Sequence, residues 1–448
     1  MASKVYFTDF RTYGKESLPH KLQRLIRAAG IGDIEMNKQF VAIKIHFGEP
    51  GNLSYLRPQY ARAVAEVVKE QGGLPFLTDC NTLYRGKRKN ALDHLEAAAE
   101  NGFNPATTGC QILIADGLKG TDEVLIDLPD GEYVKQAKVG RALMDADILI
   151  SLNHFKGHEA TGFGGALKNI GMGGGSRAGK MEQHNSGKPQ VNQKKCVGCH
   201  GCERACGQDA VAFGPDGKAR ILEDKCVGCG RCLGACNFDA VYNANGHANE
   251  ILDYKIAEYA AAICRGRPHF HISLIVDVSP QCDCHAENDA PILPNIGMLA
   301  SFYPVALDEA CADLCNAQQP LPGTLLWDAM ARPDFTDHRD HFTNTAPVTD
   351  WHFTQIHAEK LGLGWVSRSA KPLPLGMWVA RRRLGVGRRQ MAMVGDQLYT
   401  DRLAAAVYGI PAFMVVPRGS DLNATVRLKR RWEKRHWQEY YDRGGKLL

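Results

Sequence analysis

The sequence predicts an α/β protein built on a mostly parallel sheet, with a cysteine-rich module inserted into the sheet domain and a basic, partial α/β segment after it. Apolar strand-like runs alternate with amphipathic helical patterns over residues 1 to about 190, which is typical of a parallel sheet covered by helices. A cysteine motif is then duplicated, and the charge balance changes near Gly364. We therefore expect an α/β domain in two parts, residues 1–192 and 243–363. The insert between them covers residues 193–242, and the C-terminal segment covers residues 364–448.

The strands are predicted from short apolar runs bounded by turn residues. These runs cover residues 41–46, 74–79, 111–115, 146–152 and 271–278. An amphipathic helix is expected over residues 60–71.

Polar side chains follow four of these strands. Because ligands bind outside the carboxyl ends of the strands in open α/β sheets, we expect one cleft there. The alternative, polar residues that only lead each strand into solvent, fits any single one of them equally well. The residues are Lys44, His46, Asp79, Asn81, Asp116, Asn153, His154, Lys156 and His158.

Length and composition exclude several classes of protein. The chain has 448 residues, of which 44% are hydrophobic and 23% charged, so it can bury two or three cores. No apolar run approaches the roughly 18 residues of a membrane helix, and the first residues lack a signal-peptide pattern, so we expect a cytoplasmic protein without membrane contact. The 15 cysteines are an odd number, and a reducing compartment disfavours disulfides, which favours thiolate metal ligation.

The strongest signal is an internal duplication. Lys195-Cys196-Val197-Gly198-Cys199 recurs 30 residues later from Lys225 to Cys229, and each half continues to a third and a fourth cysteine. Three thiolates with two-residue spacers wrap around one iron–sulfur cube, and the fourth crosses to the other cluster. We therefore expect two [4Fe–4S] clusters, one held by Cys196, Cys199, Cys202 and Cys236 and one by Cys226, Cys229, Cys232 and Cys206.

Structural zinc is the alternative at paired Cys-x-x-Cys motifs. Zinc needs four tetrahedral ligands, and this does not explain a third cysteine at fixed spacing in both runs. The stretch resembles the bacterial two-cluster ferredoxin, with Gly207 and Asn237 where that family usually has Pro after the fourth cysteine. The change affects the turn and leaves the ligands intact.

A glycine-rich stretch from Asn153 to Lys180 precedes the insert. Its glycines would let backbone amides approach a ligand, and Lys156, Lys168 and Lys180 suit a small anionic group, with His158 among them. The spacing is not that of a P-loop or a dinucleotide-binding turn. The alternative is a glycine hinge for the insert.

These features, together with Cys282-Asp283-Cys284, the run from Pro291 to Ser301, Pro304 to Asp308 and Thr349-Asp350-Trp351, resemble the domain-of-unknown-function family 362 of ferredoxin-type iron–sulfur proteins. The resemblance covers residues 1 to about 364. It implies clusters and an α/β domain without implying a reaction. Phe302-Tyr303 stands where members commonly carry an Asp, so no acidic role is expected there.

Cys282 and Cys284 follow the last predicted strand. Such a pair can hold a soft metal, with His285 as a third donor, or exchange thiol for disulfide. A pair of small buried thiols is the alternative, and the sequence does not decide between them. Cys311 and Cys315, four residues apart, are expected in the core.

The C-terminal segment is basic, with 17 Lys and Arg against 6 Asp and Glu from Trp365 onward. Solvated helices explain this better than nucleic-acid binding, because no aromatic platform or nucleic-acid motif accompanies the charges. Lys371-Pro372-Leu373-Pro374 and Gly395-Asp396-Gln397 resemble the second half of a haloacid-dehalogenase (HAD)-type phosphatase. The resemblance implies that Lys371 steadies phosphate and that Asp396 ligates Mg²⁺.

That phosphatase chemistry also needs an Asp-x-Asp nucleophile motif on a first strand, and none precedes Lys371 in the segment. The nearest match, Asp145-Ala146-Asp147, opens a strand of the other domain. We therefore expect no phosphatase activity. A half-domain with an uncovered sheet edge favours a cap, a homo-oligomer contact or a fusion remnant.

The favoured function is intracellular electron transfer, in which the clusters serve a redox partner protein or an oxidoreductase reaction at the cleft. Two clusters with exchanged fourth ligands favour electron transfer, because one cluster would be enough to stabilise the fold. The alternatives are a binding or maturation protein with structural clusters, and a phosphatase with an accessory ferredoxin module.

Overall fold

The chain forms two compact units, Ser3–Trp365 and a second made of Val366–Leu448 with the first two residues. The first unit ends next to the predicted junction at residue 364. Three residues singled out from the sequence, Cys229, Lys371 and Asp396, lie outside the described residues. The computed structural model describes residues 3–12, 14, 16–83, 86–184, 188–226, 232, 235–236, 238, 240–243, 247–365, 387–388, 393–395, 403–410 and 412–414.

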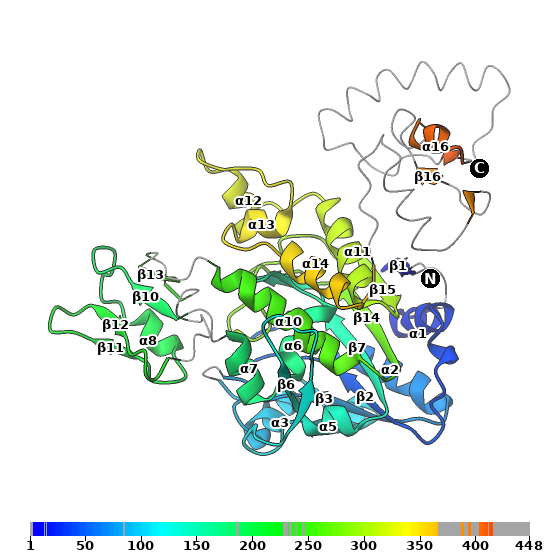
Figure 1. Ribbon diagram of the computed structural model, residues 1–448, viewed down its shortest axis with the longest axis horizontal. Helices are drawn as coiled ribbons and strands as arrows, with labels where there is room; N and C mark the ends of the chain where they lie inside the picture. The colour runs from blue at the N-terminus through cyan, green and yellow to red at the C-terminus, as the bar shows by residue number, and fades with distance from the viewer. Residues whose placement is uncertain are drawn as a thin grey trace. The chain divides into compact units, whose positions relative to one another are not determined.

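Among the described residues, a seven-stranded sheet forms the centre of the first unit (Figure 1). Neighbouring strands are parallel from β14 to β4, whereas β15 is antiparallel to both β14 and β1. The predicted α/β class with a mostly parallel sheet is therefore confirmed. In spatial order the strands are β1 (Tyr6–Asp9), β15 (Gly297–Ser301), β14 (His269–Ile275), β7 (Ile148–His154), β2 (Phe40–Lys44), β3 (Leu74–Asp79) and β4 (Gln111–Ile114).

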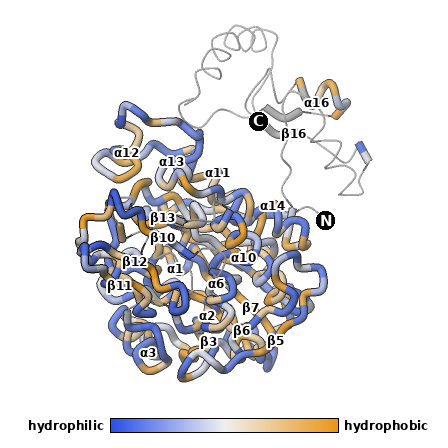
Figure 2. The backbone as a smooth tube through the Cα atoms, turned by 60° about the vertical axis from the view of Figure 1, so that its left-hand side comes forward, coloured by the Kyte–Doolittle hydropathy of each residue, from blue (hydrophilic) through white to orange (hydrophobic). Residues whose placement is uncertain are grey.

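Helices cover both faces of this sheet. One face packs against α1 (Leu18–Ala28) and α2 (Pro58–Glu70), and the other against α6 (Ala166–Gly174) and α11 (Pro304–Asn316). A longer helix, α10 (Ala248–Cys264), lies on α6. Hydrophobic and hydrophilic stretches alternate along the backbone in short runs (Figure 2), as expected of elements with one buried face.

Shorter elements connect these layers. The hairpins are β5 (Glu123–Asp127) with β6 (Gln136–Gly140) and β8 (Lys156–His158) with β9 (Gly162–Gly164). The helices are α3 (Ala91–Glu100), α4 (Pro105–Thr108), α5 (Arg141–Asp145), α7 (Arg177–His184), α12 (Leu325–Met330), α13 (His341–Thr345) and α14 (His352–Lys360), and Ile31–Asp33 forms a 3₁₀ turn.

The glycine-rich stretch differs from the expected loop, because most of it is the hairpin β8–β9 and helix α6. A Cβ on Gly171 would lie 2.2 Å from the carbonyl oxygen of Ile256 in α10, and one on Gly174 would lie 2.6 Å from Ile263. These glycines therefore let two helices pack closely. Close packing is a physical reason for glycine that a single sequence does not distinguish from a ligand loop.

The insert contains two small antiparallel pairs and α8 (Gly201–Ala205). The strand β10 (Pro189–Val191) pairs with β13 (Val241–Asn243), and β11 (Val211–Phe213) pairs with β12 (Ala219–Ile221). The 30-residue register of the sequence repeat relates β10 to β12 and β11 to β13. Each half of the duplication thus contributes one strand to each pair.

In the second unit the described residues form a strand, a helix and a parallel strand. These are β16 (Met393–Gly395), α16 (Leu403–Tyr408) and β17 (Ala412–Met414). A parallel pair joined by a helix is the basic crossover of α/β proteins.

Candidate functional site

The predicted cleft exists as one pocket beyond the carboxyl ends of β2, β3 and β7. His46, Asp79, Lys156 and Lys168, all expected from the sequence, line it. The remaining polar and thiol side chains on its wall are Thr82, Arg88, Asn169, Lys180, Cys80, Cys282 and Cys284.

A buried ion pair lies at the end of β2 and β3. Lys44 Nζ is 3.0 Å from Asp79 Oδ1 and 2.8 Å from Asn169 Oδ1. Burial raises the pKa of Asp79, but the charges of Lys44 and His46 outweigh it and hold that pKa below its usual range. Burial lowers the pKa of His94, 3.8 Å from Asp79, to about 3. Burial also lowers the pKa of Lys44, against the charge of Asp79, and a pKa of about 3 leaves the neighbouring imidazole of His94 neutral at pH 7.

Arg88 is a wall residue that the strand-end argument missed. It is 1% exposed, its Nε donates to Glu49 Oε2 at 2.8 Å, and its Nη1 lies 2.9 Å from His46 Nε2. Its Nη2 is buried and has no hydrogen-bond partner among the residues that the structure describes. A buried guanidinium nitrogen on a pocket wall is a ready donor for an anion. The signal in the sequence was the basic run Lys87-Arg88-Lys89, which follows β3.

Asp283 holds the turn that carries the two cysteines. Its carboxylate accepts from His154 Nδ1 at 2.9 Å and lies 3.2 Å from Lys156 Nζ. Burial raises the pKa of Asp283, but His154 and Lys156 outweigh this and keep the pKa below its usual range. Two of the predicted strand-end residues thus position the Cys282–Cys284 turn.

The thiol of Cys282 lies among hydrogen-bond donors. Lys168 Nζ is 3.8 Å from its Sγ, and Cys284 and His158 also hydrogen-bond to it. His158 Nδ1 accepts from the backbone N–H groups of Ala160 and Thr161 at 3.1 and 3.2 Å. An imidazole that accepts at Nδ1 carries its proton on Nε2, so Nε2 is the nitrogen that donates.

The amides expected to bind an anion have another partner. The N–H groups of Ala166 and Leu167, at the start of α6, donate to the Asp308 carboxylate at 2.6 and 2.9 Å. Lys180 Nζ donates to the carbonyls of Gly173 and Gly175 at 3.1 and 2.6 Å. These groups stabilise the two ends of α6, because helix termini leave backbone donors and acceptors unpaired.

Two other strand-end residues have structural partners. Asn81 Nδ2 donates to Asp116 Oδ1 at 2.9 Å, and Asn153 Nδ2 donates to the carbonyl of Ile272 at 2.8 Å. His285, considered as a third donor beside the thiols, instead lies 2.9 Å from Glu159 through its Nε2.

In the insert, cysteines of both runs line one pocket. They are Cys196, Cys199, Cys202 and Cys236, which is the set expected for the first cluster. Of the second set, Cys232 belongs to the same small core and Cys206 packs against it, while Cys226 is partly buried.

Backbone N–H groups point at three of the sulfurs. Ala210 N donates to Cys206 Sγ at 3.3 Å, and the equivalent Ala240 N donates to Cys236 Sγ at 3.3 Å. Ala219 N lies 3.4 Å from Cys196 Sγ. Such bonds stabilise thiolates and help to set the reduction potential of iron–sulfur clusters. The donor set thus fits a thiolate-ligated cluster.

The insert contacts the wall of the cleft. Lys89 Nζ donates to the carbonyl of Gly207 at 2.7 Å, and Gln208 Nε2 donates to the carbonyl of Leu83 at 3.1 Å. Leu83 and Arg88 both line the cleft. Gly207 directly follows Cys206 in the sequence. A predicted cluster ligand is therefore one residue away from the contact with Lys89, which is next to the wall residue Arg88.

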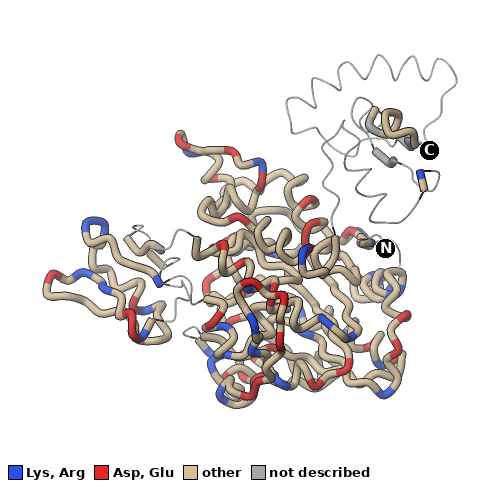
Figure 3. The backbone as a smooth tube through the Cα atoms, in the orientation of Figure 1, with Lys and Arg blue, Asp and Glu red and all other residues tan. Residues whose placement is uncertain are grey.

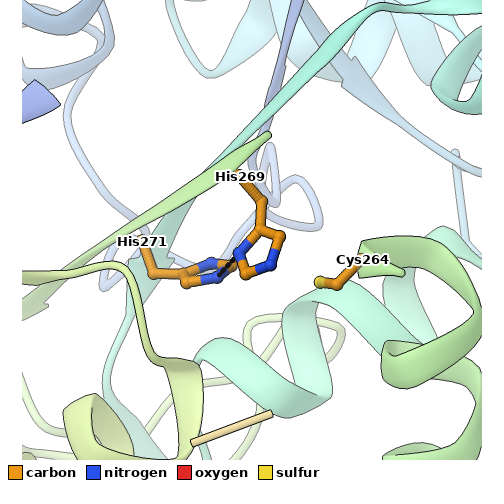
Figure 4. A group of neighbouring side chains, drawn as sticks. All are labelled: Cys264, His269 and His271. Atoms are coloured by element: carbon orange, nitrogen blue, oxygen red, sulfur yellow. Dashed lines mark hydrogen bonds between the residues drawn. The ribbon is translucent and has the colours of Figure 1, made fainter. Parts of the chain in front are cut away.

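A separate group of donors lies at the amino end of β14 (Figure 4). Cys264, His269 and His271 have ligand atoms within 4.8 Å of one another and could hold a metal ion. His269 Nδ1 and His271 Nε2 are 2.8 Å apart and hydrogen-bonded, and Ser151 Oγ lies 2.8 Å from the other nitrogen of His271. The sequence missed this group because a lone cysteine and two nearby histidines carry no recognisable spacing.

The comparisons with known proteins agree with the motifs. Residues 41–313, more than half of the chain, match the family described as Domain of unknown function (DUF362). The chain belongs to the DUF362 family. Residues 369–432 match the HAD-hydrolase-like family.

A relative of this DUF362 protein is a thylakoid-associated protein of Synechocystis sp., 26% identical over 175 residues. The match covers 38% of this chain and 50% of the relative, so the chain spans about half the length of that protein. A crystal structure of a Thermotoga maritima protein, 13% identical, covers 66% of this chain and 57% of its own with a TM-score of 0.34. That score is too low to bear on the fold.

Within the described part of the chain, every helix is too short or too polar to cross a membrane. Lys and Arg are interspersed with Asp and Glu along the described backbone of the first unit (Figure 3).

Proposed function

We propose that this DUF362 protein is an iron–sulfur electron-transfer protein, with two [4Fe–4S] clusters in the insert that serve a reaction or a redox partner at the cleft. The observation that carries the proposal is the single pocket lined by Cys196, Cys199, Cys202 and Cys236. It joins three cysteines of one run with the last cysteine of the other, as two-cluster ligation requires. The clusters would supply one-electron transfer; the chain's own residues bind and orient the acceptor.

The cleft favours a small anionic acceptor or substrate. Within the described part of the chain, Arg88 offers a buried nitrogen without a hydrogen-bond partner. Lys168 is the lysine of the wall that faces the Cys282 thiol instead of capping a helix. Charge-assisted hydrogen bonds of this kind are about twice as strong as neutral ones. We expect inorganic anions such as sulfate to compete with the acceptor or substrate for the site beside Arg88 and Lys168.

The contact between insert and cleft supports a redox role over a structural one. A cluster that acted only as a staple would gain nothing from lying beside a polar pocket. Here the residues after Cys206 are held against Leu83 and Lys89, which flank the wall residue Arg88.

The test of the proposal is cluster content. Protein purified without oxygen should contain about eight iron and eight sulfide per chain, and the reduced sample should show interacting paramagnetic centres. Metal analysis and electron paramagnetic resonance measure both. Stoichiometric zinc without sulfide, after careful reconstitution, would contradict the proposal. The variant Cys110→Ala is the control, because this cysteine lies outside the repeat and should leave the iron content unchanged.

The C-terminal segment is proposed to be catalytically silent. Its HAD-hydrolase-like match covers residues 369–432, and no Asp-x-Asp nucleophile motif precedes Lys371 in the sequence of the segment. Lys371 and Asp396 would then be remnants of a phosphate and Mg²⁺ site.

A further inference from the structure

We propose that Cys282 and Cys284 are a redox-active pair in the cleft that cycles between dithiol and disulfide. The inference rests on the proposed function for its electron source, because the pair exchanges two electrons with one-electron centres. The cysteine pair would be the group of this chain that receives electrons from the clusters.

The backbone brings the two cysteines close together. The N–H of His285 donates to the carbonyl of Cys282 at 3.0 Å, which closes a four-residue turn with the cysteines at its first and third positions. A turn folds the chain back within four residues, so its first and third residues lie closer together than alternate residues of an extended strand. Disulfides need Cα atoms below about 7 Å. The two side chains already hydrogen-bond each other.

The surroundings make the two sulfurs unequal. The hydrogen bond from Cys284, the charge of Lys168 and the hydrogen bond from His158 lower the pKa of Cys282 well below its usual value, against the effect of burial. The same hydrogen bond, together with burial, raises the pKa of Cys284. One thiolate beside one protonated thiol is the arrangement from which a disulfide forms, and low-pKa thiols are the reactive ones.

Other buried cysteines of the chain provide a contrast. Cys311 and Cys315 are fully buried in an apolar cluster, and burial raises the pKa of both well above the usual value. Burial alone therefore does not produce the environment of Cys282. The lysine and the histidine beside it do.

Oxidation of the pair releases two electrons and one proton. When the Cys282 thiolate and the Cys284 thiol are oxidised, one Sγ–Sγ bond forms, two electrons leave, and Cys284 releases one proton. Reduction reverses this and takes one proton from water. A low-potential iron–sulfur donor supplies the two electrons singly, and an oxidised acceptor in the cleft, such as a disulfide or another two-electron acceptor, removes them.

The first test is independent of the clusters. The whole protein is equilibrated without oxygen in mixtures of reduced and oxidised dithiothreitol, denatured, alkylated and digested. The peptide with Cys282 and Cys284 should gain two alkyl groups in reducing mixtures and none in oxidising ones, while that with Cys311 and Cys315 gains two throughout. Two alkyl groups on the first peptide in every mixture would overturn the proposal.

The charge of Lys168 provides a directional check. Lys168→Met removes the cation that stabilises the reduced, thiolate form, so the transition should move to more reducing mixtures. Lys119→Met, an exposed lysine, should leave the midpoint unchanged. A midpoint that does not move in Lys168→Met would contradict the assigned role of Cys282.

The second test separates the pair from the clusters. Anaerobic titration with reduced methyl viologen should deliver about four electrons per oxidised chain, two to the clusters and two to the disulfide. The double variant Cys282→Ala/Cys284→Ala should take up about two, and Cys110→Ala, outside the cleft and the cysteine repeat, about four. Equal uptake in all three refutes the inference alone, whereas missing iron with normal dithiothreitol cycling refutes the clusters alone.

Discussion

At the residue level, the cleft depends on Asp283, which lies between the two cysteines and is fully buried. His154 and Lys156 hold its carboxylate from the end of β7, and its backbone carbonyl accepts from the N–H of Glu49 at 2.9 Å. The turn is thereby fixed to two neighbouring strand ends. A buried carboxylate that is held by a histidine and a lysine is costly to disturb, because both partners would be left buried without their acceptor.

We predict that Asp283→Asn lowers the free energy of unfolding by about 3 kcal/mol at pH 7, since it leaves His154 and Lys156 buried without their acceptor. The pKa of Asp283 is lower in the folded state, so its contribution is present above the unfolded pKa of about 4 and is lost as the pH falls through the folded value. The difference from the wild type should therefore narrow in acid. Urea unfolding at several pH values measures this.

The exposed carboxylate of Asp289, on the same loop, provides the matched control. Asp289→Asn should change the free energy of unfolding by less than about 0.5 kcal/mol. A deficit in Asp283→Asn that stays constant from pH 7 down to about pH 2 would show that the effect is only lost packing.

At the level of elements, the insert has an internal two-fold arrangement. The strand pairs β10–β13 and β11–β12 each take one strand from each half of the repeat. Ala210 and Ala240, at equivalent positions, donate to Cys206 and Cys236. Cys206 and Cys236, the fourth cysteines of the two runs, therefore have matching environments. This supports two equivalent clusters over one cluster beside a second set of cysteines that no longer binds one.

The crossed ligation can be tested with double variants. Cys206→Ala combined with Cys226→Ala should lose about four iron per chain, because both residues are expected on one cluster. Cys206→Ala combined with Cys196→Ala should lose about eight, because these belong to different clusters. Iron and sulfide analysis after anaerobic reconstitution distinguishes the two. The reverse pattern would mean that each run of four binds its own cluster.

At the level of the whole molecule, the first unit closes on itself. Its first strand, β1, pairs with β15, a strand from the second half of the unit. The backbone N–H of Trp365, the last residue of the unit, donates to Ser3 Oγ at 3.0 Å. The sheet, its covering helices and the insert all lie within Ser3–Trp365. The described core of this unit is formed by its own residues.

A chain that ends at Trp365 should therefore fold and retain its iron. We expect the same iron content per chain and a thermal midpoint within a few degrees of the full chain. Neither protein should hydrolyse p-nitrophenyl phosphate with Mg²⁺. An insoluble or iron-free truncated chain would show that the two units fold together, and hydrolysis that Asp396→Asn abolishes would show that the segment is an active phosphatase.

Much of the sheet could be predicted from the sequence. The expected runs at residues 41–46, 74–79 and 111–115 correspond to β2, β3 and β4, with ends that differ by at most two residues. Short apolar runs between turn residues identify buried strands well. Their order in the sheet could not be predicted, and the antiparallel edge formed by β1 and β15 depends on pairing between distant segments.

The candidate site divides in the same way. The cysteine spacing by itself predicts thiolate ligation, and the polar strand ends predict a cleft, because both follow from local patterns that a fold must respect. Only the tertiary structure decided that Arg88 joins the cleft wall, that Lys156 lies beside Asp283, and that Lys168 faces Cys282. The reason is physical: residue type and spacing determine which groups a chain offers, whereas partners more than 100 residues apart are chosen by packing.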